Sequence, residues 1–366
     1  MNHKQRVHAA LKREQTDRVP VWMWFHPGTA KLMSNALEIP TSRLDEALGH
    51  DIRQTWVSNN YAMEGIVHEN EGDTHIDDWG IEWIKVGEFN QIKLYPLKDA
   101  SREEILSYHY PYDKADKLLN LMQPVLKYKK EYFIGCDISP SLFEMIWRLR
   151  GMEESIYDIV LDRELFQAMI NQAADFNLHL AKRAVTEFDL DWLWSGDDVA
   201  GKENLIMSPE DWREMIKPGL KEIFDVGKSN NLWMAHHCCG ALRTIIPDLI
   251  EMGLDILNPV QCDCVGMNPT ELKKDFGKEL AFMGGVDTIN LLPYASSEKV
   301  YKETKKLIEE MTEDGGGYIL AASHTIPPET PLENIFALYE AAGITKEQIF
   351  DSASKLRLMN SRQKVK

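Results

Sequence analysis

A histidine and a cysteine two residues apart, His237-x-Cys239, are the residues best suited to chemistry, and Gly240 follows them directly. In an extended segment, residues two apart point to the same side, so both side chains can reach one ion. Imidazole nitrogen and thiolate sulfur are common zinc ligands, and a catalytic zinc keeps three protein ligands and one open position. The pair therefore predicts part of a zinc site. Its alternative is a buried thiol beside a histidine that belongs to the core.

A third ligand has to come from another part of the chain. We expect His324, with Cys262 or Cys264 as alternatives. The chain has five cysteines, an odd and small number that excludes a disulfide scaffold. Four of them lie between residues 238 and 264, which favours ligands or thiols lining a site, whereas Cys136 is expected to pack in the core.

Other polar residues also follow predicted strands. Asp197 and Asp287 are candidate acid or base groups, although each could equally cap the helix that follows it. His26 and Gln261 are candidate contacts to a substrate.

The elements that position these residues alternate between short β-rich runs and longer helical patterns, as in βα units around a parallel sheet. Predicted strands cover residues 18–25, 52–58, 132–136, 190–194, 232–236, 255–260, 280–283 and 317–321. Predicted helices cover 2–14, a segment from about 42, and 140–150, 162–188, 208–229, 240–252, 296–313 and 331–342. The candidate residues follow the carboxyl ends of these strands, where the active sites of α/β barrels lie.

This order predicts an α/β fold, a (β/α)8 TIM barrel with an N-terminal helical and hairpin elaboration. A doubly wound sheet is the rival fold, but it usually carries a glycine-rich phosphate turn after its first strand. Here the first strand leads into His26-Pro27-Gly28. Residues 59–130 exceed one βα unit, and we expect them to form an inserted excursion over the barrel mouth. The whole chain, 1–366, is predicted to be a single domain.

Composition excludes several partners. The 366 residues carry a formal net charge of −17 with no basic cluster, which argues against nucleic acid and anionic membranes. No apolar stretch approaches 18 residues, so no membrane span is expected. The amino-terminal residues lead into an amphipathic helix and not into the apolar region of a signal peptide. We therefore expect a cytoplasmic protein.

Along most of its length the sequence resembles the uroporphyrinogen decarboxylase superfamily. The matching stretches are 4–22, 143–151, Gly196-Asp197-Asp198 with Ser208-Pro209, His237-x-Cys239-Gly240, Gly284-Gly285-Val286-Asp287 and 330–335. The resemblance implies a (β/α)8 barrel with its active site in the mouth.

One branch of that superfamily fits better than the other. True decarboxylases carry Arg-Gln-Ala-Gly-Arg after the first strand, where the arginines hold the carboxylates of a tetrapyrrole. This chain has no arginine between Arg18 and Arg43. It is more similar to the corrinoid-dependent methyltransferases, including methylcobalamin:coenzyme M methyltransferases, whose zinc is held by a His-x-Cys pair and a distant cysteine. His324 stands where that distant cysteine would be.

The resemblance implies zinc-dependent transfer of a methyl group between a corrinoid and a small thiol or methyl-ether type substrate. The corrinoid would be carried by a partner protein or used free, and the protein could form a homodimer. The direction of transfer stays open. The alternative enzyme is a metal-free decarboxylase or lyase acting on a small carboxylic acid, with His324 and Asp197 as acid/base groups. A non-enzymatic ligand-binding protein is the third reading.

Overall fold

The computed structural model describes residues 1–363, which form two compact units. The terminal unit contains residues 1–53, 131–133 and those from 258 onward, and the central unit contains residues 54–130 and 134–257. The chain passes from one unit to the other inside three strands, between Arg53 and Gln54, between Phe133 and Ile134 and between Leu257 and Asn258.

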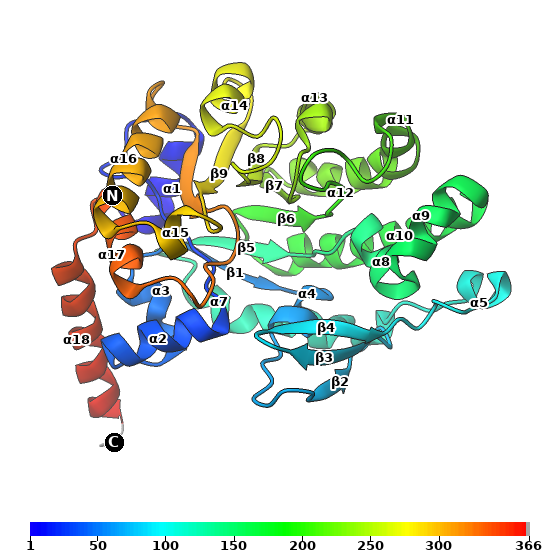
Figure 1. Cartoon of the computed structure of the whole chain (residues 1–366), viewed down its shortest axis with the longest axis horizontal. Coiled ribbons are helices and arrows are strands. Elements are labelled where there is room, and N and C mark those ends of the chain that lie inside the picture. Colours follow the sequence, from blue (N-terminus) through cyan, green and yellow to red (C-terminus); the bar gives the residue numbers. More distant parts are fainter. Residues whose placement is uncertain (364–366) are drawn as a thin grey trace. The chain divides into compact units, whose positions relative to one another are not determined.

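A curled sheet of seven strands is the main β-structure of the described chain, and its strand order follows the sequence, β1-β5-β6-β7-β8-β9-β10 (Figure 1). The pairs β5–β6, β6–β7 and β9–β10 are parallel. The strands are β1 Ile52–Trp56, β5 Phe133–Asp137, β6 Trp192–Gly196, β7 Trp233–His237, β8 Ile256–Val260, β9 Ala281–Val286 and β10 Tyr318–Ala322. Seven of the eight predicted strands are thus confirmed, with ends shifted by a few residues.

The first predicted strand, residues 18–25, is wrong as a regular strand, so the eight-stranded barrel is not confirmed. The segment forms two isolated parallel bridges, Val21 with Leu320 and Phe25 with Ile326. The Trp22 amide still donates to the Leu320 carbonyl over 3.1 Å. Pro20 has no N–H group, so the ladder cannot extend from Val21 toward the amino terminus, but the break between Val21 and Phe25 lies after this proline.

The central unit contains the helices α4 to α13. They are α4 Asn60–Glu64, α5 Arg102–Leu106, α6 Ala115–Leu119, α7 Gln123–Leu126, α8 Phe143–Arg150, α9 Met152–Leu161, α10 Arg163–Glu187, α11 Pro209–Asp211, α12 Lys217–Ser229 and α13 Ile246–Met252. A π-helical turn, 212–216, joins α11 to α12. The Ser208 hydroxyl accepts the Asp211 N–H over 3.0 Å and so caps the predicted helix 208–229. Helices predicted at 140–150 and 162–188 are confirmed.

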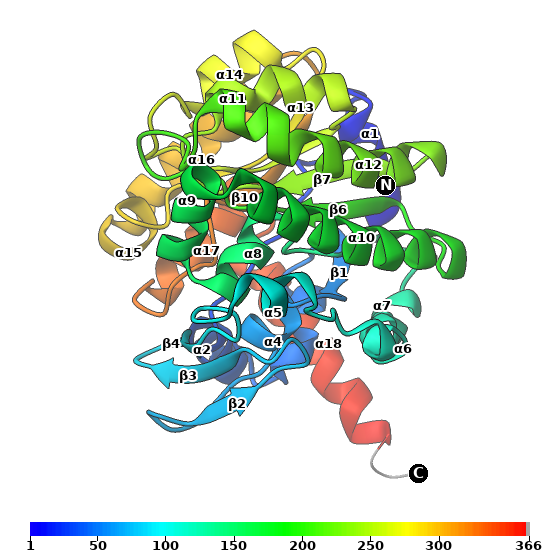
Figure 2. The same ribbon diagram turned by 90° about the vertical axis from the view of Figure 1, so that its right-hand side faces the viewer.

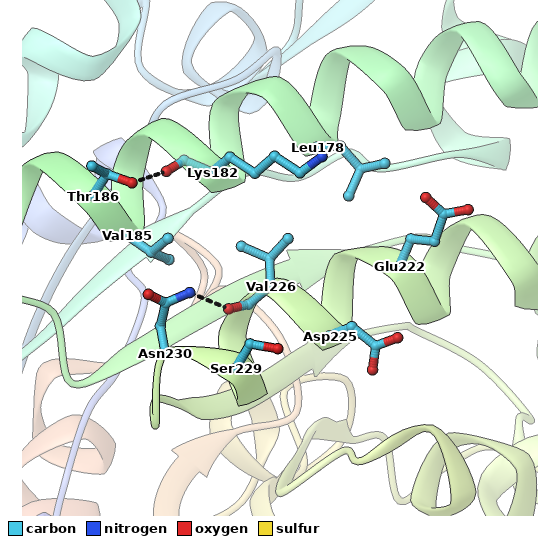
Figure 3. Close-up of a pocket in the computed structure, with 9 residues that line it drawn as sticks. All are labelled: Leu178, Lys182, Val185, Thr186, Glu222, Asp225, Val226, Ser229 and Asn230. Atoms are coloured by element: carbon cyan, nitrogen blue, oxygen red, sulfur yellow. Dashed lines mark hydrogen bonds between the residues drawn. The ribbon is translucent and has the colours of Figure 1, made fainter.

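Helices α10 and α12 pack side by side and leave a groove of about 440 Å³ between them (Figure 3). Val185 of α10 and Val226 of α12 point toward each other in this groove, whereas Glu222 and Asp225 lie along its α12 side. These helices cover the outside of the sheet, so the groove is separate from the strand ends that carry the candidate site.

A small antiparallel sheet occupies part of the inserted segment 59–130 (Figure 2). Its strands are β2 Thr74–Ile76, β3 Glu82–Val86 and β4 Phe89–Leu94. Trp83 is buried, and its indole N–H donates to Asp77 over 2.8 Å. Strands β3 and β4 pair antiparallel, which confirms the predicted hairpin. Its position over a barrel mouth stays a prediction.

The helices of the terminal unit are α1 His3–Leu11, α2 Pro27–Leu37, α3 Leu44–Ala47, α14 Pro269–Phe276, α15 Leu291–Tyr294, α16 Ser297–Thr312, α17 Leu332–Ala341 and α18 Lys346–Gln363. A buried carboxylate, Asp51, holds the amino-terminal part of this unit together. Its oxygens accept hydrogen bonds from Arg6 over 2.6 Å and from Arg18 over 2.7 Å. They also accept the Val21 N–H over 2.8 Å and contact a His3 ring nitrogen over 2.8 Å.

Two tryptophans of β6 belong to the core. Trp192 and Trp194 are fully buried, with ring centroids 5.1 Å apart. Gly135 of β5 lies against them, because a Cβ atom at this position would stand 1.7 Å from the Trp192 indole nitrogen. A glycine inside a strand is explained here by the close approach of a large ring. Within residues 1–363, no helix is long and apolar enough to cross a membrane.

Candidate metal centre

The His237–Cys239 pair lies where two parallel strands of the central unit end together. His237 is the last residue of β7 and pairs in register with Gly196, the last residue of β6. The His237 Nε2 and Cys239 Sγ atoms are 3.4 Å apart, and both residues are half-buried. The two donor atoms of the predicted pair therefore lie close together.

Gly240 explains why the chain turns sharply after Cys239. Its φ angle is +97°, which disfavours residues with a side chain. A Cβ atom here would also lie 2.6 Å from the carbonyl oxygens of Ala200 and Gly201. The next amide, of Ala241, donates to the Gly201 carbonyl over 2.8 Å. The loop after β7 is thus pinned against the loop after β6.

Asp198 connects these two loops at the candidate ligands themselves. Its Oδ1 atom accepts the backbone N–H of Cys239 over 2.8 Å and lies 3.9 Å from His237 Nε2. Asp198 belongs to the Gly196-Asp197-Asp198 stretch, in which the residue pattern assigns it no separate role. Two adjacent acids after a strand were the available signal, but the sequence did not distinguish their functions.

The geometry of the pair fits a zinc ion. With Zn–N near 2.0–2.1 Å, Zn–S near 2.3 Å and a tetrahedral angle, the two donor atoms should be about 3.6 Å apart. The observed separation is 3.4 Å. Cys238, between the two, is fully buried, and burial raises the pKa of its thiol well above the usual value. Its Sγ faces the Cys239 carbonyl, 3.4 Å away, and takes no part in the pair.

Asp197 is the residue that caps α8. Its buried carboxylate accepts the N–H groups of Leu142, Phe143 and Glu144 over 3.1, 3.2 and 2.8 Å. Burial raises the pKa of Asp197 to about 7 and nearby Glu144 adds to this, whereas the three hydrogen bonds oppose it. Asp197 thus caps a helix that precedes it in the chain, and not the following helix that the sequence offered as the alternative to an acid or base role.

A buried ion pair on α8 was missed by the sequence analysis. Arg148 donates to Glu144 over 2.5 Å and to Asn59 over 3.0 Å, and the arginine is only 1% exposed. Glu144 in turn accepts the Asp198 N–H over 3.4 Å. Burial raises the pKa of Glu144, while the charge of Arg148 opposes that change. This pair therefore connects α8 to the residue that holds the Cys239 loop.

The remaining candidates lie in the terminal unit. The His26 ring accepts the Gly28 N–H over 3.1 Å and caps α2. Asp287 accepts the N–H groups of Ile289 and Asn290 over 2.6 and 2.9 Å, so it stabilises the turn before α15. His324 is exposed, two residues beyond β10.

Gln261, Cys262 and Cys264 follow β8 in the same unit. Cys264 is buried, whereas Gln261 and Cys262 are half-buried. Burial, with the nearby charges of Asp287 and Asp263, raises the pKa of the Cys262 thiol to about 12. The thiol therefore stays protonated at neutral pH unless a metal ion displaces its proton.

Comparison with known proteins agrees with this architecture. The family model for uroporphyrinogen decarboxylase (URO-D) matches residues 139–343, more than half of the chain, so the chain belongs to this family. A methylated-thiol–coenzyme M methyltransferase of Methanosarcina mazei is 24% identical over 62% of this chain and 59% of its own length. The methylcobamide:CoM methyltransferase MtaA of Methanosarcina barkeri is 29% identical over 47% of this chain and 48% of its own length.

The chain thus spans only about half to three-fifths of the length of these curated relatives. Among solved structures, a methyltransferase from Methanosarcina mazei superimposes with a TM-score of 0.70 at 20% identity. That superposition covers 94% of this chain and 98% of the other. The similarity shows a shared α/β fold.

Proposed function

We propose that this protein is a zinc-dependent methyltransferase that moves a methyl group between a corrinoid and a small thiol or methyl-ether type substrate. The observation that carries the proposal is the 3.4 Å separation of His237 Nε2 and Cys239 Sγ, which suits one tetrahedral zinc ion. Family membership and relatives named as methylcobamide:CoM methyltransferases support the reaction type.

The proposed ligands are His237, Cys239 and His324, each of which offers one donor atom to an ion. Cys262 or Cys264 is the alternative third ligand. Two imidazoles and one thiolate leave a fourth position open for a substrate heteroatom. Because imidazole is neutral, this set holds one anionic charge fewer than a His-Cys-Cys set. A zinc ion held by two imidazoles and one thiolate would therefore be more electrophilic than one held by a His-Cys-Cys set.

When bound, zinc would lower the pKa of a coordinated thiol or polarise a substrate heteroatom. The chain's own residues supply position. Asp198 holds the Cys239 amide, and Gly240 lets the loop turn so that sulfur and imidazole face the same point. We propose Asp197 and Asp287 as the acid or base groups, and His26 and Gln261 as substrate contacts.

The partners follow from the same proposal. The corrinoid would be carried by a separate protein or used free, and its partner in the reaction would be a small methyl donor or acceptor. A cytoplasmic homodimer remains our expectation from the family.

Metal analysis of the purified full chain tests the metal proposal. We expect one zinc per chain, loss of zinc in Cys239→Ser, and retention in the neighbouring control Cys238→Ser. Anaerobic incubation with methylcobalamin and a panel of thiols, 2-mercaptoethanesulfonate included, should change the cobalt absorbance. A zinc-free protein, together with unchanged activity of Cys239→Ser, would contradict the proposal. Carbon dioxide release from small carboxylic acids without metal would favour the decarboxylase or lyase alternative.

A further inference from the structure

A continuous chain of hydrogen bonds runs through the central unit from the inserted hairpin to the proposed ligand Cys239. It begins at Trp83 in β3, whose buried indole N–H donates to Asp77 Oδ2 over 2.8 Å. Asp77 Oδ2 also accepts the side-chain amide of Asn59 over 2.7 Å. Asp77 Oδ1 accepts two backbone N–H groups of the turn 79–81 over 2.8 and 3.0 Å. Asp77 therefore fixes the base of the hairpin and connects it to Asn59.

Arg148 continues the chain toward the metal pair. Its Nη1 atom donates to Asn59 Oδ1 over 3.0 Å, and its Nη2 atom donates to Glu144 over 2.5 Å. The same guanidinium lies over the indole ring of Trp83, 5.9 Å from the ring centre, so it also contacts the hairpin directly. Glu144 then accepts the Asp198 N–H over 3.4 Å, the longest link of the chain.

The chain crosses four neighbouring strand ends in the order of the sheet. Asn59 follows β1, Glu144 follows β5, and Asp198 follows β6. Asp198 Oδ1 accepts the N–H of Cys239, which follows β7, over 2.8 Å. Strands β1, β5, β6 and β7 are neighbours in this order (Figure 1). Each of these segments is therefore connected to the next, the first two through Arg148, and the last bond is made at a proposed metal ligand.

Burial makes the middle links of this chain specific. Asn59 is fully buried, and Arg148 and Glu144 are 1% and 7% exposed. A flipped Asn59 side chain would turn its N–H groups toward the guanidinium and its oxygen toward the Asp77 carboxylate, so only one orientation satisfies both neighbours. A buried polar group that loses its partner is costly, and a displacement of one member should therefore move the next.

We propose that Asn59, Asp77 and Arg148 are positioning residues through which the inserted hairpin sets the position of Cys239 at the metal centre. The inference rests on the proposed function, because it takes Cys239 as a zinc ligand. The hairpin would then act on the metal centre although it supplies none of the proposed ligands. Loss of a middle link should loosen the Cys239 loop and lower zinc affinity without removing a ligand.

The zinc affinity of the full chain, measured by competition with a fluorescent chelator, tests this proposal. Asn59→Leu removes the link to the hairpin and keeps the ion pair of Arg148 with Glu144. Arg148→Met removes the guanidinium from the same chain. We expect each variant to lower zinc affinity by about 3- to 10-fold.

A matched control lies on the same helix. Arg150 donates to Asp158 over 2.9 Å and to the Leu97 carbonyl over 2.8 Å, and these partners lie outside the chain. Arg150→Met should therefore keep the zinc affinity of the wild type.

Arg148→Met/Glu144→Gln takes the place of Arg148→Met if that variant does not fold. The double variant leaves no uncompensated carboxylate at Glu144, and the glutamine oxygen can still accept the Asp198 N–H. Its zinc affinity should remain about 3- to 10-fold below that of the wild type, because the link to Asn59 is missing.

Cobalt(II) in place of zinc gives a second readout, which a general loss of stability would not move. Its visible absorption and its thiolate-to-cobalt charge-transfer band report the coordination geometry. Asn59→Leu should shift both bands, whereas Arg150→Met should reproduce the wild-type spectrum. Asn59→Leu/Asp198→Ala should bind zinc no more weakly than Asp198→Ala alone, because the last link is already cut.

A wild-type zinc affinity and cobalt spectrum in Asn59→Leu would overturn the inference. Losses of affinity that multiply in the double variant with Asp198→Ala would overturn it as well, because independent sites behave in that way. In both cases the wild type still binds zinc, so only this inference fails. If the wild type binds no zinc, the proposed function fails and the inference fails with it.

Discussion

At the scale of single residues, the chemistry of the His237–Cys239 pair depends on a neighbour that is not itself a proposed ligand. Asp198 accepts the Cys239 N–H over 2.8 Å, and its carboxylate lies 3.9 Å from the imidazole of His237. Removing a group that orients a metal ligand in this way often lowers the metal affinity strongly. Asp198 therefore belongs to the proposed metal centre as the residue that positions the Cys239 loop.

We predict that Asp198→Ala lowers zinc affinity by about 10- to 100-fold, because the Cys239 loop loses its anchor. Asp198→Asn keeps an oxygen that can accept the same N–H, so its loss should be smaller. Competition with a fluorescent zinc chelator measures both values. Equal zinc affinities of the wild type and the alanine variant would show that Asp198 does not support metal binding.

A second prediction at this scale concerns the third ligand. His324→Ala should reduce bound zinc to well below one per chain, because two protein ligands hold the ion poorly. Cys262→Ser and Cys264→Ser should leave the zinc content unchanged. His324→Cys should retain zinc, since a thiolate can replace the imidazole. The result that would reassign the ligand is zinc loss in either cysteine variant with full retention in His324→Ala.

At the scale of elements, the start of α8 is held by one buried carboxylate. Asp197 accepts three consecutive N–H groups, which would otherwise be buried without a partner at a helix end. The same helix carries Glu144 and Arg148, so its position determines where this ion pair meets the loop after β6.

We predict that Asp197→Ala lowers the free energy of unfolding by about 2–4 kcal/mol, from a lost cap and buried unsatisfied donors. Ser208→Ala, which removes the cap of α11, should cost only about 1 kcal/mol because that turn is more exposed. Urea unfolding followed by tryptophan fluorescence compares the two. An Asp197→Ala protein as stable as the wild type would contradict the structural role of this cap.

At the scale of the whole molecule, the amino-terminal segment depends on buried charge. Burial alone would raise the pKa of Asp51, but His3, Arg18 and Arg6 hold it below its usual value. A carboxylate with a lowered folded-state pKa stabilises the fold above its unfolded pKa, about 3.9, and this contribution disappears as pH falls through the folded value. The contribution of Asp51 is therefore present at neutral pH and is lost only in acid below the usual carboxyl pKa.

We expect Asp51→Asn to lower the free energy of unfolding by about 3–5 kcal/mol at pH 7, because it leaves buried guanidinium groups uncompensated. The difference from the wild type should shrink only below about pH 4, as the pH falls through the lowered folded-state pKa of Asp51. Asp17→Asn, which removes a 45% exposed partner of the same Arg6, should cost about 0–1 kcal/mol. Equal costs for the two variants at pH 7 would contradict this account.

Local patterns predicted most of the architecture. Buried strands such as β6 and β7 are short apolar runs that end in polar residues, and this pattern can be read directly. The segment 18–25 shows where propensity fails, since its aromatic and β-branched residues favour a strand but form only two isolated bridges, at Val21 and Phe25. Helix α9 shows a second limit. It buries Ser155 and Asp158 together with Ile159, whereas Val160 and Leu161 are exposed, so its apolar residues do not all face the core.

The sequence by itself determined the order of the elements, the acidic net charge and the His237-x-Cys239 pair, because these depend on composition or on neighbours two to four residues apart. The tertiary structure decided which acids surround that pair and which caps a helix. Asp197 and Asp198 are adjacent, but their hydrogen-bond partners lie about 40 to 55 residues away, and no local spacing encodes such contacts. It also decided that Glu144 and Arg148 are buried, because an i,i+4 ion pair has the same spacing whether it faces solvent or the core.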